Sequence, residues 1–477
     1  MNRRAFLAMA GLALLADAAR ADDTPLAQES APLDVAVIGA GLAGLSAAAA
    51  AHEAGAGRVA VFEKEAVVGG HSALSTGYFS AVRRLKGPEA EYRKAVEEMI
   101  RDMKTTGRNR GDPKLVRIVA EQSGNAYEWL SRIGVFWLPT PYEALGGMAP
   151  RSYLTSFVRG GYDLVLAVNR LVRKRGIPVS LSSRVEDIER KAGSWFLTVK
   201  DIRGRKKVEA KAIVIATGGF TGNVSLRTRY DPRLTSEIHS TADPYGDGHD
   251  SATGDGILLG QRLGADTIDM ESILTIPFSG GRLTNYVGAD IYLDENGKRF
   301  VSEQASMSEI SDAVWKLPNH RFWVLTDAQS QKGASRNVKL IRGIVKTART
   351  LDEASRGMGI PPAVLRDTVS RYNSYARRHK DPEFGRTLFT QEITTPPFYF
   401  GLEQPFVHFC NGGLRISPRA EVLDKGGNPI GGIFAAGEVT GGVHGAGRLG
   451  GCSLPDCVVF GRIAGYEAAK LAGKKAR

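Results

Sequence analysis

The chain has 477 residues, of which 43% are hydrophobic and 24% are charged, and its formal net charge is +12. This length is enough for more than one domain, and the composition is typical of a globular protein. The positive charge is not accompanied by an aromatic–basic module, so we expect no nucleic-acid partner.

The first predicted element is a processing segment over residues 1–21. Arg3 and Arg4 precede an uncharged stretch at 5–16, and residues 19–21 (ARA) form a small-x-small cleavage pattern. The stretch is too short to span a bilayer, so we expect no stable membrane insertion. The paired arginines resemble a twin-arginine signal, which predicts export of the folded protein to the periplasm. An ordinary secretory signal is the alternative. Residues 22–32 are predicted to be a linker.

The next elements form a βαβ unit. Apolar residues at 33–38 predict a strand, GAGLAG follows at 39–44, and an alanine-rich helix runs to about residue 54. The second strand, at 58–62, ends at Glu63. A glycine loop between a strand and a helix holds a pyrophosphate at the helix N-terminus, and an acidic residue about 20 positions later binds a ribose. Glu63 lies 19 residues after Gly44, so the unit predicts a dinucleotide site.

The remaining pattern predicts an α/β protein with an interrupted first domain. Helices are expected at 88–105, 112–132 and 351–380, and a meander at 177–215. Short strands and turns at 245–350 predict an inserted second domain. We therefore predict a Rossmann-type domain at 33–244 and 351–477, interrupted by a smaller α+β capping domain at 245–350.

Further glycine turns indicate FAD rather than NAD. ATGG at 216–219, GDG at 254–256 and AAGE at 435–438 spread contacts over the chain, as a permanently held flavin requires. The three cysteines, Cys410, Cys452 and Cys457, form neither a C-x-x-C-H haem site nor an iron–sulfur motif. We predict no metal site and expect any electron relay on another protein.

The chain resembles a known family in several motifs. Residues 426–465 (GGNPIGGIFAAGEVTGGVHGAGRLGGCSLPDCVVFGRIAG) are similar to the soluble fumarate reductase and flavocytochrome c flavoproteins, which are related to succinate dehydrogenase flavoprotein subunits. GAGLAG, GGHSALSTGYFSA, ATGGF, TGDGILLGQRLGADTIDM and NGKRFVSE follow the same family in order. The resemblance implies a flavin domain, a capping domain and a substrate between them. The implied cofactor residues are Gly39, Gly41, Leu42, Ala43, Gly44, Glu63, Lys64, Gly69, Gly70, His71, Ser72, Gly77, Val185, Ala216, Thr217, Gly218, Asp255, Gly437, Glu438, Ser453 and Leu454.

The resemblance also implies a carboxylate anchor at His408 and Arg448, two cationic donors that stabilise negative charge as hydride passes from flavin N5 to the β-carbon. Other family positions have changed. Apolar or aromatic residues stand at 276–278 (IPF), and Arg282, Leu283 and Tyr286 replace family polar residues. Met307 falls at the family's proton-donating arginine and cannot donate a proton.

Two interpretations of this pattern stay open. The substrate is either an unsaturated monocarboxylate with an apolar end, such as an acrylate or arylacrylate, with Tyr286 as the new acid, or a fumarate-like dicarboxylate clamped by Arg282. The electron donor would be an external cytochrome or another redox protein. The alternatives are a dehydrogenase or oxidase of a saturated substrate such as a ketosteroid, and a non-catalytic electron carrier. His71 falls where membrane-bound relatives attach FAD covalently, so either a covalent bond or a hydrogen bond to the cofactor is expected.

Overall fold

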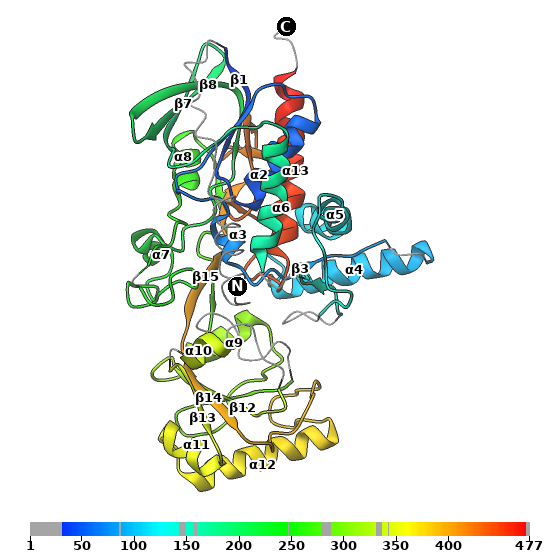
Figure 1. The fold of residues 1–477 in the computed structure, drawn as a ribbon, viewed down its shortest axis with the longest axis vertical. Helices are drawn as coiled ribbons and strands as arrows, with labels where there is room; N and C mark the ends of the chain where they lie inside the picture. The colour runs from blue at the N-terminus through cyan, green and yellow to red at the C-terminus, as the bar shows by residue number, and fades with distance from the viewer. Residues whose placement is uncertain are drawn as a thin grey trace, which may run out of the picture.

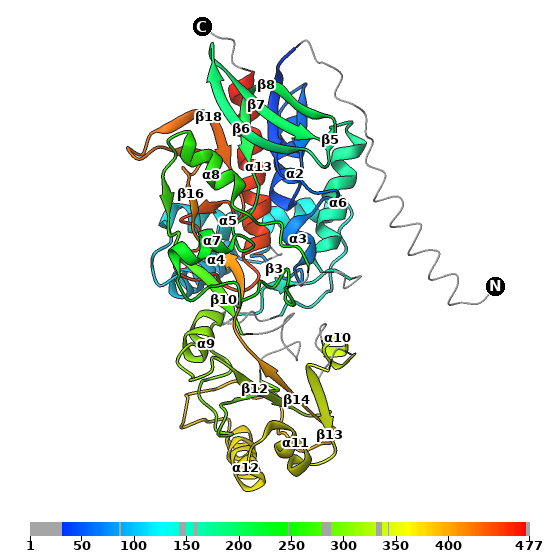
Figure 2. The ribbon, with the colours of Figure 1, turned by 90° about the vertical axis from the view of Figure 1, so that its left-hand side faces the viewer.

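The computed structural model describes residues 31–84, 87–142, 149–156, 160–246, 248–277, 288–330, 336–341 and 343–473, with the backbone alone at 307–308 and 336–338. These residues form two regions. The first region holds residues 31–277 and 404–473, and the second region holds residues 288–403 (Figures 1 and 2). Within the described part of the chain, no helix combines the length and hydropathy needed to cross a membrane.

The first region is built on a mainly parallel sheet in the order β17-β18-β8-β1-β2-β5. Its strands are β1 (Leu33–Ile38), β2 (Val59–Phe62), β5 (Val179–Ser180), β8 (Gly204–Ile215), β17 (Glu421–Leu423) and β18 (Pro429–Ala435). β1, β2, β8 and β18 run parallel in register, and residues 35–38 of β1 and all of β2 are continuous apolar runs. Strands buried on both faces have this pattern. The meander expected at 177–215 is present, because β6 (Arg184–Lys191) and β7 (Ser194–Asp201) extend β8 antiparallel.

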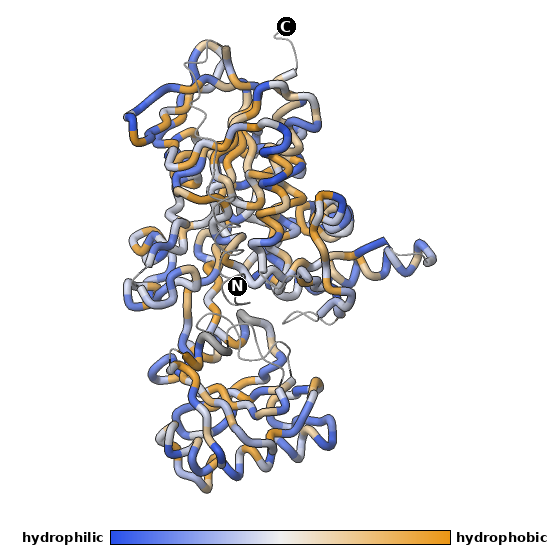
Figure 3. The backbone as a smooth tube through the Cα atoms, viewed as in Figure 1, coloured by the Kyte–Doolittle hydropathy of each residue, from blue (hydrophilic) through white to orange (hydrophobic). Residues whose placement is uncertain are grey.

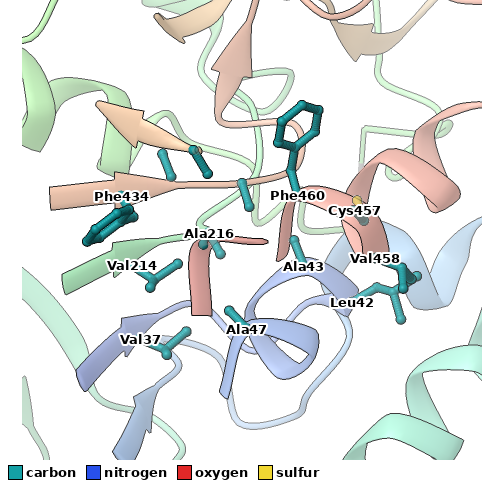
Figure 4. Close-up of a cluster of buried hydrophobic side chains, with 14 of the residues drawn as sticks. Val37, Leu42, Ala43, Ala47, Val214, Ala216, Phe434, Cys457, Val458 and Phe460 are labelled. Carbon is teal, nitrogen blue, oxygen red and sulfur yellow. The ribbon is translucent and has the colours of Figure 1, made fainter. Parts of the chain in front are cut away.

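Two helices cross the centre of this sheet and touch each other closely. α2 (Leu42–Glu53) is rich in alanine, and α13 (Ser453–Ala472) lies against it in Figure 1. A Cβ on Gly465 would lie 2.0 Å from the carbonyl oxygen of Ala47, so only glycine permits this approach. The surrounding side chains form the largest hydrophobic cluster, part of which Figure 4 shows, and hydrophobic stretches gather in this interior in Figure 3.

The other elements of the first region surround this core. The helices expected at 88–105 and 112–132 are present as α4 (Glu89–Thr106) and α5 (Pro113–Arg132). The remaining helices are α3 (Gly70–Leu74), α6 (Gly161–Lys174), α7 (Val224–Tyr230) and α8 (Asp255–Arg262). Short ladders join β3 (Phe79–Ser80) to β4 (Ser152–Tyr153), and β16 (Gly413–Arg415) to β9 (Thr267–Ile268) and β19 (Thr440–Gly441).

The second region is a four-stranded antiparallel sheet covered by helices. The strands, in the order β11-β12-β14-β13, are Ile291–Leu293, Phe322–Thr326, Phe398–Glu403 and Val345–Ala348. The helices are α9 (Met307–Val314), α10 (Arg336–Ile341), α11 (Leu351–Met358) and α12 (Pro362–Arg378). Side chains of α11 and α12 share one hydrophobic cluster with β11, β12 and β14. α11 and α12 therefore belong to the second region, whereas the sequence pattern placed residues 351–380 in the Rossmann-type domain. The identification of this region as a capping domain and the bounds of that domain stay predictions.

Two paired strands connect the regions. The chain leaves the first region through β10 (Ile273–Ile276) and returns through β15 (Phe406–Cys410), and the two pair antiparallel. β15 continues the line of β14 in Figure 1. The connection therefore places His408 at the junction of the two regions.

Candidate active site

Three loops meet at one edge of the central sheet. Residues 39–41 follow β1, residues 216–218 follow β8 and residues 436–438 follow β18, and these strands are neighbours that run parallel. The carboxyl ends of parallel strands share an edge, which is where open α/β sheets bind ligands. The structure thus brings together three of the four predicted glycine motifs, from residues almost 400 positions apart.

The first loop leaves a helix N-terminus available to an anion. Gly39 has φ +104, and a Cβ there would lie 2.3 Å from the carbonyl oxygen of Ala216. A Cβ on Gly44 would lie 1.9 Å from the Gly39 oxygen, so helix and strand pack without a side chain between them. α2 begins after Gly41 with no side-chain cap, and Leu42 N is 3.4 Å from Ser72 Oγ. Uncapped amides at such a terminus bind phosphate.

Glu63 lies beside this loop at the end of β2. Its Oε2 accepts a hydrogen bond from Ala40 N at 2.7 Å, and its Oε1 accepts one from Glu65 N at 2.9 Å. Burial raises the pKa of the Glu63 carboxyl. The backbone bonds fix the carboxylate next to the glycine loop, in the place predicted for a ribose contact.

Lys64 and Asp255 contact each other. Lys64 Nζ is 3.1 Å from Asp255 Oδ2, and Arg184 donates to Asp255 Oδ1 at 2.7 Å. Asp255 begins α8, whose Gly256 N bonds to the hydroxyl of Thr217 at 3.1 Å. The ion pairs of Asp255 with Lys64 and Arg184 therefore connect α8 to the ends of β2 and β6, near the glycine loop at 216–218.

The other predicted cofactor residues divide between open positions and packed ones. A Cβ on Gly70 or Gly218 would meet no atom within 4 Å, and Gly69 forms a bridge with Gly41. Gly77 is packed against Gly160, and the Val185 side chain is in the core. Ala43, Gly437, Ser453 and Leu454 lie where α2, the loop after β18 and α13 meet.

His408 projects from β15, and its Nδ1 lies 2.9 Å from Thr241 Oγ1. Burial, together with the charges of Arg448 and His71, lowers the pKa of His408 to about 3. At neutral pH the ring is therefore an uncharged hydrogen-bond donor, in contrast to the cation expected from the sequence.

Arg448 supplies the positive charge of this site. Its guanidinium lies over the Phe409 ring, 4.9 Å from the centroid, and donates to Leu449 O at 3.2 Å. Its Nε is buried and has no partner among the described residues. Phe409 also packs with Leu274 and Ile276, so the Nε donor of Arg448, which has no partner among the described residues, borders an apolar wall.

The comparisons with known proteins agree with this geometry. The family model described as "FAD binding domain" matches residues 34–454. The chain belongs to this FAD-binding family. It is 34% identical over 456 residues to a probable fumarate reductase of Shewanella frigidimarina, which covers 92% of this chain and 75% of that one. It is 30% identical to the acrylate reductase flavoprotein subunit of Shewanella woodyi, covering 97% of both chains.

A solved structure of the same family supports the fold. The open conformation of a flavocytochrome c3 fumarate reductase matches with a TM-score of 0.73 and 32% identity, over 97% of this chain and 81% of that chain. The α/β fold and the membership in the FAD-dependent oxidoreductases predicted from the sequence are confirmed.

FAD fits the residues that this family member presents. The uncapped start of α2, the open space at Gly70 and Gly218, and the carboxylate of Glu63 form a cradle along the edge of the sheet. Asn411, three residues after His408, is 1% exposed, and neither atom of its amide has a partner among the described residues. Buried amides without partners are rare in proteins, so the Asn411 amide is available to a ligand or an ordered water at this end of the cradle.

His71, on α3, faces two carboxylates in this FAD-binding site. Its Nε2 lies 2.7 Å from Asp250 Oδ1, and its Nδ1 lies 3.5 Å from Glu438 Oε2. Glu438 Oε1 in turn accepts a hydrogen bond from Cys410 N at 2.9 Å. Burial opposes protonation, but the bonds and charges of Asp250 and Glu438 outweigh it and raise the pKa of His71 to about 10.

Some site residues were missed from the sequence, and some predicted ones cannot be placed. Thr241, Asp250, Phe409 and Asn411 join the site only through folding, and no motif marked them. The predicted residues Phe278, Arg282, Leu283 and Tyr286 lie outside the described residues, as does the side chain of Met307.

Proposed function

We propose that the protein is an FAD-dependent reductase of the C=C bond of an α,β-unsaturated carboxylate that carries an apolar group at its other end. The observation that supports this most is the position of Arg448, whose unpaired Nε and stacked guanidinium adjoin the apolar cluster of Leu274, Ile276 and Phe409. A substrate carboxylate would accept a hydrogen bond from the Nε of Arg448, and an acryl or arylacryl group would pack against the apolar cluster. The names of the fumarate and acrylate reductase relatives support the same reaction class.

Two residues would bind the carboxylate in different ways. Arg448 offers a charged donor, and a buried charge-assisted hydrogen bond is about twice as strong as a neutral one. His408 is uncharged; with its Nδ1 bonded to Thr241, its Nε2–H is free to donate. The charge of Arg448 balances the charge of one substrate carboxylate, and the neutral His408 adds a hydrogen bond. If His408 were also a cation, its buried charge would have no counter-charge from a monocarboxylate.

The reaction balances with two electrons and two protons. When bound and reduced by two electrons, FAD would supply the hydride; the β-carbon would receive it and the α-carbon would receive a proton, which yields the saturated acid and oxidised FAD. When the hydride reaches the β-carbon of the substrate, negative charge develops at the α-carbon and spreads onto the carboxylate. Arg448 would stabilise the charge there. Electrons would come from a cytochrome or another redox protein.

The proton donor and the far end of the substrate depend on the segment that carries Arg282 and Tyr286. We keep Tyr286 as the proposed acid and Arg282 as the alternative clamp for a second carboxylate. The apolar cluster at Ile276 favours the monocarboxylate.

The test is anaerobic oxidation of reduced methyl viologen by the purified FAD-loaded protein with fumarate, acrylate, methacrylate, cinnamate and urocanate. Turnover of a monocarboxylate, abolished by Arg448→Gln and kept by Arg415→Gln, supports the proposal. Arg415 is a matched control because it forms a surface pair with Asp266. Turnover of fumarate alone favours the Arg282 clamp, and no turnover with any acid would overturn the reductase proposal.

We also propose export to the periplasm through the twin-arginine signal. Replacing Arg3 and Arg4 together by lysine should leave the protein in the cytoplasm with FAD bound. Equal amounts of both forms in the periplasm would contradict this proposal.

A further inference from the structure

His71 lies between the two halves of the ligand site. On one side, the next residue, Ser72, contacts Leu42 N at the start of α2, beside the phosphate loop. On the other side, Glu438 connects His71 to Cys410, two residues after His408. The imidazole therefore stands between the place of the phosphates and the place of the substrate, where the flavin ring has to lie.

Both ring nitrogens face carboxylate oxygens, and both carboxylates are held in place. The Asp250 and Glu438 side chains are 5% and 8% exposed. Asp250 also accepts hydrogen bonds from Thr221 Oγ1 at 2.7 Å and Ala252 N at 2.9 Å. Turning either carboxylate away from His71 would break these bonds and leave a buried charge without a partner, which is costly.

A ring between two carboxylates has to carry a proton on each nitrogen. A neutral imidazole has one N–H and one lone pair, and the lone pair would point at a negative oxygen. The protonated ring donates to both sides and neutralises one of the two buried charges. Other titratable groups face this cluster. His408 is uncharged, and burial raises the pKa of the Cys410 thiol, which interacts with both carboxylates. The charge of Arg227 acts on Asp250, and the charge of Arg448 acts on Glu438.

We propose that His71 is a permanent imidazolium of the cofactor site, that Asp250 and Glu438 are its positioning residues, and that FAD is bound without a covalent bond to this histidine. A covalent bond would require an unprotonated nitrogen to act as nucleophile, and the two carboxylates remove that lone pair. The inference rests on the FAD site and is independent of the substrate proposed above.

The charge of His71 has a consequence for the bound cofactor. A fixed cation favours the more negative, reduced form of a neighbouring group. Removing the cation would leave Asp250 and Glu438 facing the flavin as unbalanced charges. His71 therefore raises the reduction potential of the flavin through its charge.

The first test is the intact mass of the purified holoprotein after denaturation in acid. We expect the mass of the polypeptide alone and FAD in the supernatant. A polypeptide that keeps one FAD after denaturation would overturn the proposal.

The second test uses nitrogen-15 spectra of histidine-labelled holoprotein. The chain has eight histidines, and we expect one of them to stay protonated on both nitrogens at pH 8.5. In Asp250→Asn that signal should titrate at lower pH, and in His249→Asn it should not change. His249 is a matched control because it adjoins Asp250 but is 66% exposed and contacts Glu65. Eight rings that are all neutral at pH 8.5 would contradict the proposal.

The third test is the reduction potential of the flavin, measured without substrate. His71→Asn should lower the equilibrium constant for two-electron reduction at least tenfold, which is about 30 mV. His249→Asn should leave the potential unchanged, and an unchanged potential in His71→Asn would overturn the charge effect. These readouts need no turnover, so they separate a failure of this inference from a failure of the proposed reaction.

Discussion

Thr241 Oγ1 lies 2.9 Å from Nδ1 of His408, although the two residues are 167 positions apart in the sequence. A threonine hydroxyl can donate to an unprotonated ring nitrogen or accept from a protonated one. The carboxylate-binding role proposed for His408 requires the tautomer in which Thr241, in the loop that precedes α8, donates and the single imidazole proton lies on Nε2.

Thr241→Val removes this hydrogen bond and keeps the shape of the side chain. Because the Nε2–H tautomer is no longer favoured, we expect kcat/KM to fall about tenfold, the magnitude of one buried hydrogen bond. Steady-state kinetics with the acid that turns over best would measure the change. Thr241→Ser keeps the hydroxyl and should keep most of the activity, and equal kcat/KM in Thr241→Val and the native protein would refute the role.

The two histidines of the site should affect stability in opposite pH ranges. The pKa of His408 is lowered to about 3, so the unfolded chain binds a proton that the folded chain rejects, and stability falls as pH drops below about 6.5. The pKa of His71 is raised to about 10, so its contribution is complete below 6.5 and is lost as pH rises toward 10.

Urea unfolding at a series of pH values would check this difference. Compared with the native protein, His408→Gln should lose less stability between pH 6.5 and 4. His71→Asn should lose less between pH 7 and 10. Curves that stay parallel to the native curve in both variants would show that the two rings do not titrate as described.

Ile276 should select substrates by the size of their apolar end, because it forms the wall beside Arg448 together with Leu274 and Phe409. In Ile276→Ala we expect the ratio of kcat/KM for cinnamate to that for acrylate to change about tenfold, as for other changes of an apolar pocket. The control is Ile273→Ala, since Ile273 lies on the same strand but packs against the larger core. An equal change of the ratio in both variants would exclude a specific role of Ile276.

Gly465→Ala should destabilise the protein through the contact between α13 and α2. The added Cβ would lie 2.0 Å from Ala47 O, and overpacking of this kind costs about 1–3 kcal/mol or more. Thermal unfolding of the FAD-loaded protein would report a lower Tm. Gly431→Ala is the control, because a Cβ there meets no atom within 4 Å, and a similar Tm in both variants would contradict the prediction.

Much of the first region could be predicted from the sequence because its signals are local. The apolar run at 33–38 and the glycines of 39–44 specify strand, loop and helix within about 20 residues, and the ribose contact of Glu63 stays a prediction. The periodicity of 88–105 and 112–132 likewise predicted α4 and α5 almost to the residue. The position of α11 and α12 was not predictable in this way, because a helix pattern does not say on which sheet the apolar face packs.

The sequence by itself determined the glycine loop and the resemblance to FAD-dependent reductases, since each is written in neighbouring residues. It also predicted the carboxylate anchor of His408 and Arg448, each from its own short motif, and that role stays a prediction. Only the tertiary structure decided the charges of the site. His71 meets Asp250 across 179 positions, and His408 loses its charge through burial beside Arg448. A pKa depends on every group packed around the proton, and those groups come together only when distant parts of the chain fold onto one sheet edge.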